Sequence, residues 1–121
     1  MRLAIRRSLP VLLLLAALAA PSSAAAAPTA EASRTCDVGR STSYGTTYVL
    51  SITTRYVRCA RAKDLVRAFH RCRQGPRGRC ASVWGYSCSE YRFNKSALSF
   101  DSRVRCARSG KVVRHRYTQF L

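Results

Sequence analysis

Acidic residues are scarce in this sequence. Only five aspartates and glutamates stand among its 121 residues, against 22 lysines and arginines, and the formal net charge is +17. A charge of this size attracts polyanions at long range, and the candidates outside a cell are nucleic acid, anionic cell-wall polymers and acidic lipid surfaces. The alternative is that the charge is compositional, because 19 of the basic residues are arginines, as happens when a GC-rich genome biases codon use.

Several catalytic and metal-binding patterns are also missing. The sequence has no G-x-S-x-G, no phosphate-binding glycine loop, no clustered carboxylates, and no C-x2-C or H-x3-H spacing of the kind that holds zinc. We therefore expect no metal and no cofactor. The sequence does contain the residue types of a ribonuclease active site. They are acid–base groups and cations for a phosphate, namely His70, His115, Glu90, Lys63 and Lys111.

The spacing of the two histidines argues against that enzyme. His115 falls on the apolar face of a predicted hairpin, whereas His70 falls on the basic flank of a predicted helix. Nothing in the spacing brings the two rings together. The simpler interpretation is that His115 is buried in the core and His70 is exposed to solvent, with neither in an active site. We therefore favour a protein that is not an enzyme.

No apolar run in the sequence has the length of a typical membrane span. Residues 11–20 are all valine, leucine or alanine, three arginines precede them, and a segment rich in small residues follows. This is the layout of a secretory signal peptide. We expect cleavage after Ala26 and a secreted, extracellular chain that carries no membrane span after the signal is removed. A single-span anchor is the alternative, which Pro21 makes less favourable.

The mature chain would be a single domain. Residues 27–35 are rich in alanine, proline and threonine and predict a flexible lead-in, and residues 36–121 predict one domain, which we expect to be a monomer. A domain of this size buries only about 60–65% of the surface its unfolded chain exposes, so cross-links would help it. Export to an oxidising compartment allows them.

All six cysteines lie in that domain and predict three disulfides. Cys72 and Cys80 would close a short loop over the Gly75-Pro76 turn. The other four permit several pairings. We favour Cys59 with Cys88 and Cys36 with Cys106, with the swapped pairings close behind.

The clearest element is an amphipathic helix over residues 59–72. Its apolar positions follow the i, i+3, i+4, i+7 spacing of one helix face, and they are Ala62, Leu65, Val66, Phe69 and Cys72. A cysteine at each end would staple the helix. The rest predicts strands over residues 46–58 and 83–93, a hairpin over 102–117, and a short strand after Cys36. The fold class is therefore α+β, with one helix packed on an antiparallel sheet of four or five strands.

The predicted core combines one face of each strand with the helix stripe. In the first long strand, Tyr48, Leu50 and Ile52 share a face at period two. The expected core residues are Tyr48, Leu50, Ile52, Leu65, Val66, Phe69, Trp84, Tyr86, Val104 and Val113.

The hairpin predicts a cluster of arginines. With Ser109-Gly110 as its two-residue turn, Arg105 lies opposite Arg114 and Arg103 lies opposite Arg116, all on one face. Like charges directly opposite one another destabilise a sheet. The four therefore either splay into solvent with their stems over apolar surface, or bind an anion. The helix cations are a second candidate anion-binding patch, and they are Lys63, Arg67 and Arg71.

Three short motifs carry a resemblance. They are Val57-Arg-Cys-Ala-Arg-Ala62 leading into a helix with Val66 and Phe69, then Gly85-Tyr-Ser-Cys88, then the segment 104–113 with Cys106 and Gly110. Together they resemble small secreted domains of unknown function from high-GC bacteria, with a Cys-x-x-Ala helix, a Gly-aromatic-x-Cys strand and a Cys-x-x-x-Gly hairpin. The resemblance implies a compact α+β domain stapled by cysteines. It implies no activity, so no functional residues are carried over, and the Cys72–Cys80 pair looks like an addition to the layout.

Three functions follow as hypotheses. The favoured one is a non-catalytic basic module that binds an anionic polymer or partner at the cell envelope through the hairpin arginines. The second is a secreted ribonuclease or other phosphodiesterase that uses His70 or His115. The third is an inhibitor or structural partner of another exported protein, which would need an exposed apolar patch.

Overall fold

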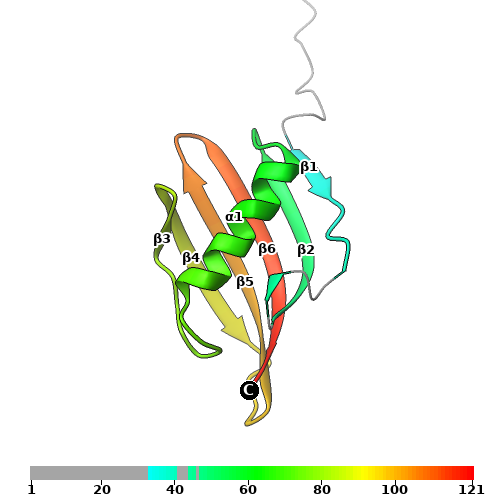
Figure 1. Cartoon of the computed structure of the whole chain (residues 1–121), viewed down its shortest axis with the longest axis vertical. Coiled ribbons are helices and arrows are strands. Elements are labelled where there is room, and N and C mark those ends of the chain that lie inside the picture. Colours follow the sequence, from blue (N-terminus) through cyan, green and yellow to red (C-terminus); the bar gives the residue numbers. More distant parts are fainter. Residues whose placement is uncertain (1–32, 41–43, 46) are drawn as a thin grey trace, which may run out of the picture.

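One helix packs on a six-stranded antiparallel sheet in this computed structural model, which describes residues 33–40, 44–45 and 47–121 (Figure 1). In chain order the elements are β1 (Ser33–Cys36), β2 (Thr47–Arg55), α1 (Cys59–Cys72), β3 (Ser82–Val83), β4 (Tyr86–Phe93), β5 (Ser99–Arg108) and β6 (Lys111–Phe120). The strands lie side by side in the order β1-β2-β6-β5-β4-β3. The α+β class is confirmed, whereas the expected number of four or five strands is wrong.

The strand count differs at the two edges of the sheet, and the short strand expected after Cys36 is wrong, because residues 37–40 belong to no strand. β1 begins at Ser33, so the last three residues expected in the flexible lead-in are strand, and the predicted signal peptide lies outside the described residues. At the other edge, the strand predicted over residues 83–93 is interrupted. Trp84 and Gly85 both have positive φ, 52° and 76°, as a two-residue hairpin turn requires, and they separate β3 from β4.

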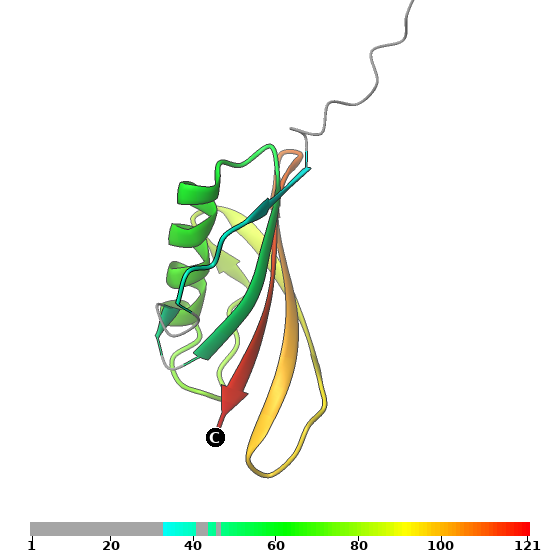
Figure 2. The ribbon, with the colours of Figure 1, turned by 90° about the vertical axis from the view of Figure 1, so that its right-hand side faces the viewer.

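The helix has the bounds that the sequence predicts. Ala62, Leu65, Val66 and Phe69 are all buried, whereas Cys72 is exposed. α1 lies on one face of the sheet, called the inner face below (Figure 2), and crosses the strands diagonally (Figure 1). The opposite, outer face is covered by no helix or strand of the described part of the chain. None of the described helices is long and apolar enough to cross a membrane.

The core lies between α1 and the inner face. Of the residues expected there, Ile52, Leu65, Val66, Phe69, Tyr86, Val104 and Val113 are buried. Tyr48 and Leu50 are not: their exposed fractions are 39% and 52%. A β-bulge between Val49 and Ser51 shifts the alternation by one residue, so the first half of β2 turns Val49 inward instead. Trp84, expected in the core, lies in the exposed turn instead.

The three disulfides form, with one expected pairing confirmed. Cys72 bonds to Cys80, Cys36 to Cys59, and Cys88 to Cys106. The favoured pairing of Cys59 with Cys88 and Cys36 with Cys106 is wrong. Cys88 and Cys106 are directly opposite in the β4–β5 register, with Cα atoms 4.1 Å apart, which leaves Cys36 to tie edge strand β1 to the start of α1.

Candidate anion-binding face

Two rows of arginines cross the centre of the outer face. The β5–β6 register pairs Arg103 with Arg116 and Arg105 with Arg114, as the sequence predicts. The turn that sets this register is Ser109-Gly110, and both residues have positive φ. All four arginines are exposed, and the residues that alternate with them on the inner face are buried: Val104, Cys106, Val113, His115 and Tyr117.

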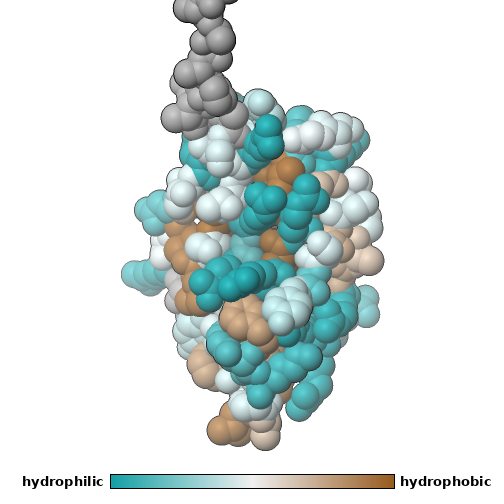
Figure 3. Space-filling view, turned by 180° about the vertical axis from the view of Figure 1, so that it is seen from behind, coloured by the Kyte–Doolittle hydropathy of each residue, from teal (hydrophilic) through white to brown (hydrophobic). Residues whose placement is uncertain are grey.

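Neutral polar side chains extend each row to the neighbouring strands. Ser51 of β2 pairs with Arg116, and Tyr91 of β4 pairs with Arg103. In the other row, Thr53 pairs with Arg114 and Ser89 with Arg105. These eight residues line a shallow groove of about 550 Å³. Figure 3 views the molecule from this side and shows hydrophilic residues across its middle.

The positive charge of the groove is not neutralised within the described residues. No carboxylate there forms an ion pair with any of the four arginines. Asp101 lies one row further along β5, where its carboxylate accepts hydrogen bonds from Thr118 at 2.6 Å and Asn94 at 2.8 Å. Those two hydrogen bonds lower the pKa of Asp101, and the charge of Arg116 adds only a smaller effect. The groove is thus a concentrated positive site.

Aromatic rings adjoin the arginines, and the sequence analysis did not single them out. The guanidinium carbon of Arg103 lies 4.9 Å from the centre of the Phe93 ring, and that of Arg116 lies 5.7 Å from it. The ring of Tyr91 stacks on that of Phe93, with centres 6.0 Å apart and planes at 14°. The sequence did indicate their position, because Tyr91 and Phe93 alternate with the predicted inward residues of their strand and so fall on its outer face.

The helix cations form a separate surface. Lys63, Arg67 and Arg71 belong to α1, which lies on the inner face, so they are not continuous with the arginine rows. Arg67 pairs with Asp64 at 3.1 Å and stacks over the ring of Tyr44. The sequence predicted this second patch, and the structure places it on the other side of the sheet from the first.

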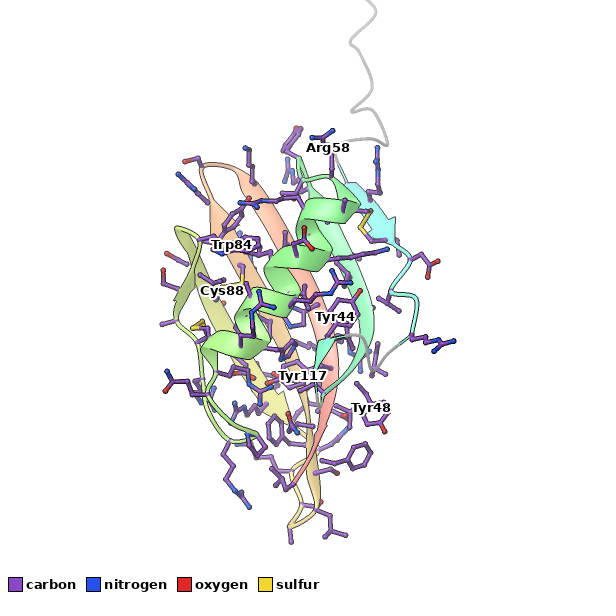
Figure 4. The ribbon with its side chains drawn as sticks, in the orientation of Figure 1. Tyr44, Tyr48, Arg58, Trp84, Cys88 and Tyr117 are labelled. Atoms are coloured by element: carbon purple, nitrogen blue, oxygen red, sulfur yellow. A yellow bond between two sulfur atoms is a disulfide. The ribbon has the colours of Figure 1, made fainter. Side chains whose placement is uncertain are left out.

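The structure brings together the two histidines that the sequence analysis had kept apart. Nε2 of His70 lies 3.2 Å from Nε2 of His115, and both rings contact Phe69 and Tyr117 edge-on or stacked. The expectation of a solvated His70 is wrong, because its ring packs against the rings of His115 and Tyr117. Figure 4 shows Tyr117 just below that end of α1. The buried position expected for His115 is confirmed.

A buried arginine fixes the protonation of this pair. Arg73, unremarked in the sequence, donates to Nδ1 of His70 at 3.1 Å, so the His70 proton must be on Nε2 and points at Nε2 of His115. The His115 proton is then on Nδ1. Burial and the charge of Arg73 lower the pKa of His70 to about 3, and burial, His70 and Arg73 lower the pKa of His115. Both rings are therefore neutral near pH 7.

Glu90 anchors the neighbouring part of the same interior. Its carboxylate accepts hydrogen bonds from Tyr117, from Ser102 at 2.9 Å and from Arg92 at 3.2 Å. Burial would raise the pKa of Glu90, but these hydrogen bonds outweigh it and lower the pKa. Burial and the Glu90 carboxylate raise the pKa of Tyr117 to about 12. Glu90 is thus ionised, and its carboxylate is engaged in hydrogen bonds with neighbouring side chains.

This interior cluster is built for structure more than for proton transfer. Its two histidines contact one another and are held neutral, whereas general acid–base catalysis of phosphate cleavage needs an accessible base and a protonated acid near neutral pH. No group of three or more potential metal-ligating side chains occurs in residues 33–40, 44–45 and 47–121. The groove on the outer face is accordingly the stronger candidate for function.

Comparison with protein-family models, with curated proteins and with solved structures finds no match for this chain. The disulfide-bonded cysteines and the α+β fold agree with the resemblance to small secreted domains. Function must therefore be argued from the site.

Proposed function

We propose that this protein is a non-catalytic module that binds an anionic polymer through the four arginines of its outer face. The observation that carries the proposal is the pairing of Arg103 with Arg116 and of Arg105 with Arg114, with no carboxylate of the described residues as an ion-pair partner. Each such pair of like charges costs stability in the free protein. A bound polyanion supplies the missing opposite charge and releases its own counterions, which is a source of binding free energy.

The chemistry of the groove supports binding without catalysis. Its side chains are arginine, serine, threonine and tyrosine, all of which donate hydrogen bonds to phosphate, sulfate or carboxylate oxygens. His115, Glu90 and Val104 belong to strands under the groove, but they alternate with the groove residues and turn inward. The groove therefore offers recognition of negative charge and no acid–base pair.

The proposed place of action is the cell envelope. Three disulfides fit an extracellular location, where an oxidising environment keeps them formed. Polymers of repeated negative charge in that compartment include cell-wall polymers and released nucleic acid.

Retention on immobilised heparin tests the proposal. The variant replaces Arg103, Arg105, Arg114 and Arg116 with glutamine, which keeps a polar side chain and removes the charge. The control replaces the exposed cations Arg34, Arg40, Arg58 and Arg77 with glutamine, an equal loss of four charges away from the groove and from the helix cations. We expect the groove variant to elute at clearly lower salt than the control. Equal elution of the two variants would mean that net charge alone drives retention.

The ribonuclease hypothesis gains no support from the geometry. His70 and His115 contact one another inside the molecule, so they do not flank a space that would hold a phosphate. An RNA-degradation assay with the wild type, His70→Ala and His115→Ala tests it directly. We expect intact RNA with all three proteins; activity lost in either variant would instead establish the enzyme.

The hypothesis of a protein partner has one structural feature in its favour. Leu98, Phe120 and Leu121 are exposed, and the backbone N–H of Leu121 donates to the carbonyl of Leu98 at 2.8 Å, which holds them at one end of the sheet. These side chains are the kind of exposed apolar patch that the hypothesis requires. It stays a prediction that a search for bound exported proteins would test.

A further inference from the structure

The aromatic rings beside the arginines have no role in binding simple negative charge. Tyr91 has an exposed fraction of 66%, and its ring lies almost parallel to that of Phe93. Folding normally buries such rings, whereas here the Tyr91 ring is open to solvent and the Phe93 ring is only half-buried. Their position in the groove therefore calls for a ligand with apolar, flat groups as well as negative charge.

The rings and the cations form one continuous surface. Tyr91 occupies the same cross-strand row as Arg103 and Arg116, and Phe93 occupies the next row with Asp101 and Thr118. Arg103 and Arg116 both lie over the Phe93 ring. A ligand that reaches the guanidinium groups thus meets a ring within the same row. Figure 3 shows less polar residues beside the hydrophilic ones in the lower half of this face.

We propose that the polymer bound by this face is a single-stranded nucleic acid, with its phosphates on the four arginines and its bases stacked on Tyr91 and Phe93. The inference rests on the proposed function, because it names the anionic polymer. Proteins that bind single strands without sequence preference combine a positive groove along the backbone with exposed aromatic rings for the bases. Sheet faces that carry such rings are one established platform for them.

Other polyanions fit these residues less well. Sulfated polysaccharides and phosphate-rich cell-wall polymers carry charge but no planar aromatic groups, so they would leave the Tyr91 ring without a partner. In a nucleic acid duplex the bases are already paired and stacked, and a shallow sheet face cannot reach them. A single strand offers free base faces and charge together.

The test uses two probes that differ only in bases. One is a fluorescent twelve-nucleotide oligo(dT), and the other is an abasic strand of the same length and charge. Heparin serves as a third polyanion in competition. The ring variant is Tyr91→Thr with Phe93→Leu, which keeps strand-compatible side chains. Its control is Trp84→Asn, which removes an exposed ring stacked on Arg61 of α1; asparagine tolerates the positive φ of that turn position.

We expect wild type and control to bind oligo(dT) at least fivefold more tightly than the abasic strand, since stacking of one base on one ring contributes roughly 5- to 150-fold in affinity. The ring variant should lose that preference and keep its affinity for the abasic strand and heparin. Circular dichroism confirms that each variant is folded.

Three results would overturn the inference. Equal affinity of the wild type for the two strands would show that bases are not read, while polyanion binding would stand. A ring variant that loses heparin and oligo(dT) equally would show that the rings only support the arginines. Tighter binding of a twelve-base-pair duplex, added as a fourth probe, than of the single strand would exclude stacking. Loss of the proposed function itself is a separate outcome, in which the four-glutamine variant binds every probe as the wild type does.

Discussion

Arg103 and Arg116 lie directly opposite one another on β5 and β6 and share the ring of Phe93, with guanidinium carbons 4.9 and 5.7 Å from its centre. The ring's negative face offsets part of the repulsion, by roughly 0.5–1 kcal/mol for an exposed contact of this kind. Arg105 and Arg114 form the neighbouring pair, and no aromatic ring of the described residues lies against either guanidinium group. The groove therefore concentrates charge at a cost in stability, which is expected of a binding surface and not of a scaffold.

Removing one charge from the second pair should stabilise the free protein. We expect Arg114→Thr to raise the free energy of unfolding by about 0.2–1 kcal/mol at low salt, because Arg105 then faces a neutral residue that favours strands. The gain should shrink in 1 M salt, where the Debye length falls to about 3 Å. Urea unfolding at the two salt concentrations measures it. A destabilised Arg114→Thr at low salt would show that the arginine stem matters more than its charge.

Stability should fall as the pH drops below about 6.5. The folded pKa of His70 is about 3, so between pH 6.5 and 3 the unfolded chain binds a proton that the folded protein does not. The loss for one such group is about 1.4 kcal/mol per pH unit, and His115 adds to it in the same direction. Glu90, whose pKa is lowered, contributes only below its ordinary pKa of 4.5.

Urea unfolding at pH 7.5, 6.0 and 5.0 measures this slope. His70→Gln is the comparison, since it removes one titrating ring: we expect it to be less stable at pH 7.5 but to lose less on acidification. Equal slopes in the two proteins would mean that His70 titrates normally in the folded state.

Truncation of Glu90 should be severe. Glu90→Ala removes the carboxylate that accepts from Tyr117, Ser102 and Arg92, and it leaves the charge of Arg92 with backbone carbonyls as its acceptors. The loss of one partner from a buried charged network costs about 3–5 kcal/mol. Asp64→Ala is the control, because Asp64 forms an exposed ion pair with Arg67 worth at most about 1 kcal/mol. Thermal unfolding compares them. Similar melting temperatures for both variants would contradict a structural role for Glu90.

The disulfides should contribute unequally. Loops of 23 and 8 residues separate the partners in Cys36–Cys59 and Cys72–Cys80, and a longer loop restricts the unfolded chain more. Replacing both cysteines of Cys36–Cys59 with serine should cost about 3–4 kcal/mol, against about 2–3 kcal/mol for Cys72–Cys80. Denaturant unfolding of the two double variants gives the order. The reverse order would indicate that the 72–80 loop supports the interior through Arg73.

Local pattern was enough to predict the helix and the arginine pairs. The apolar spacing within residues 59–72 and the Ser109-Gly110 turn each depend on residues that are close together in the chain. The structure confirms the helix bounds and the β5–β6 register that they predict. The bulge after Val49 was not predictable, because a one-residue shift in β2 has no local signature and depends on pairing with β6. For the strand break at Trp84-Gly85, the sequence contained only a weak indication, which was the single glycine.

The histidine pair depends on contacts between distant parts of the chain. His70 and His115 are 45 residues apart, and they meet because α1 crosses the inner face above β6. The buried Arg73 is held by the carbonyls of Pro76 and Gly78 and by Gln119, a combination that no spacing rule describes. Gly78 is required there, since a Cβ would lie 1.6 Å from the carbonyl oxygen of Arg73.

The most direct measurement is the salt dependence of oligo(dT) binding by wild type and by the variant with glutamine at Arg103, Arg105, Arg114 and Arg116. Each phosphate contact on a single strand contributes a slope of about 0.7 in log K against log salt. We expect the slope of the four-glutamine variant to be shallower by about 3. The equal-charge variant at Arg34, Arg40, Arg58 and Arg77 should change little. Identical slopes for wild type and the groove variant would contradict binding at the arginine face.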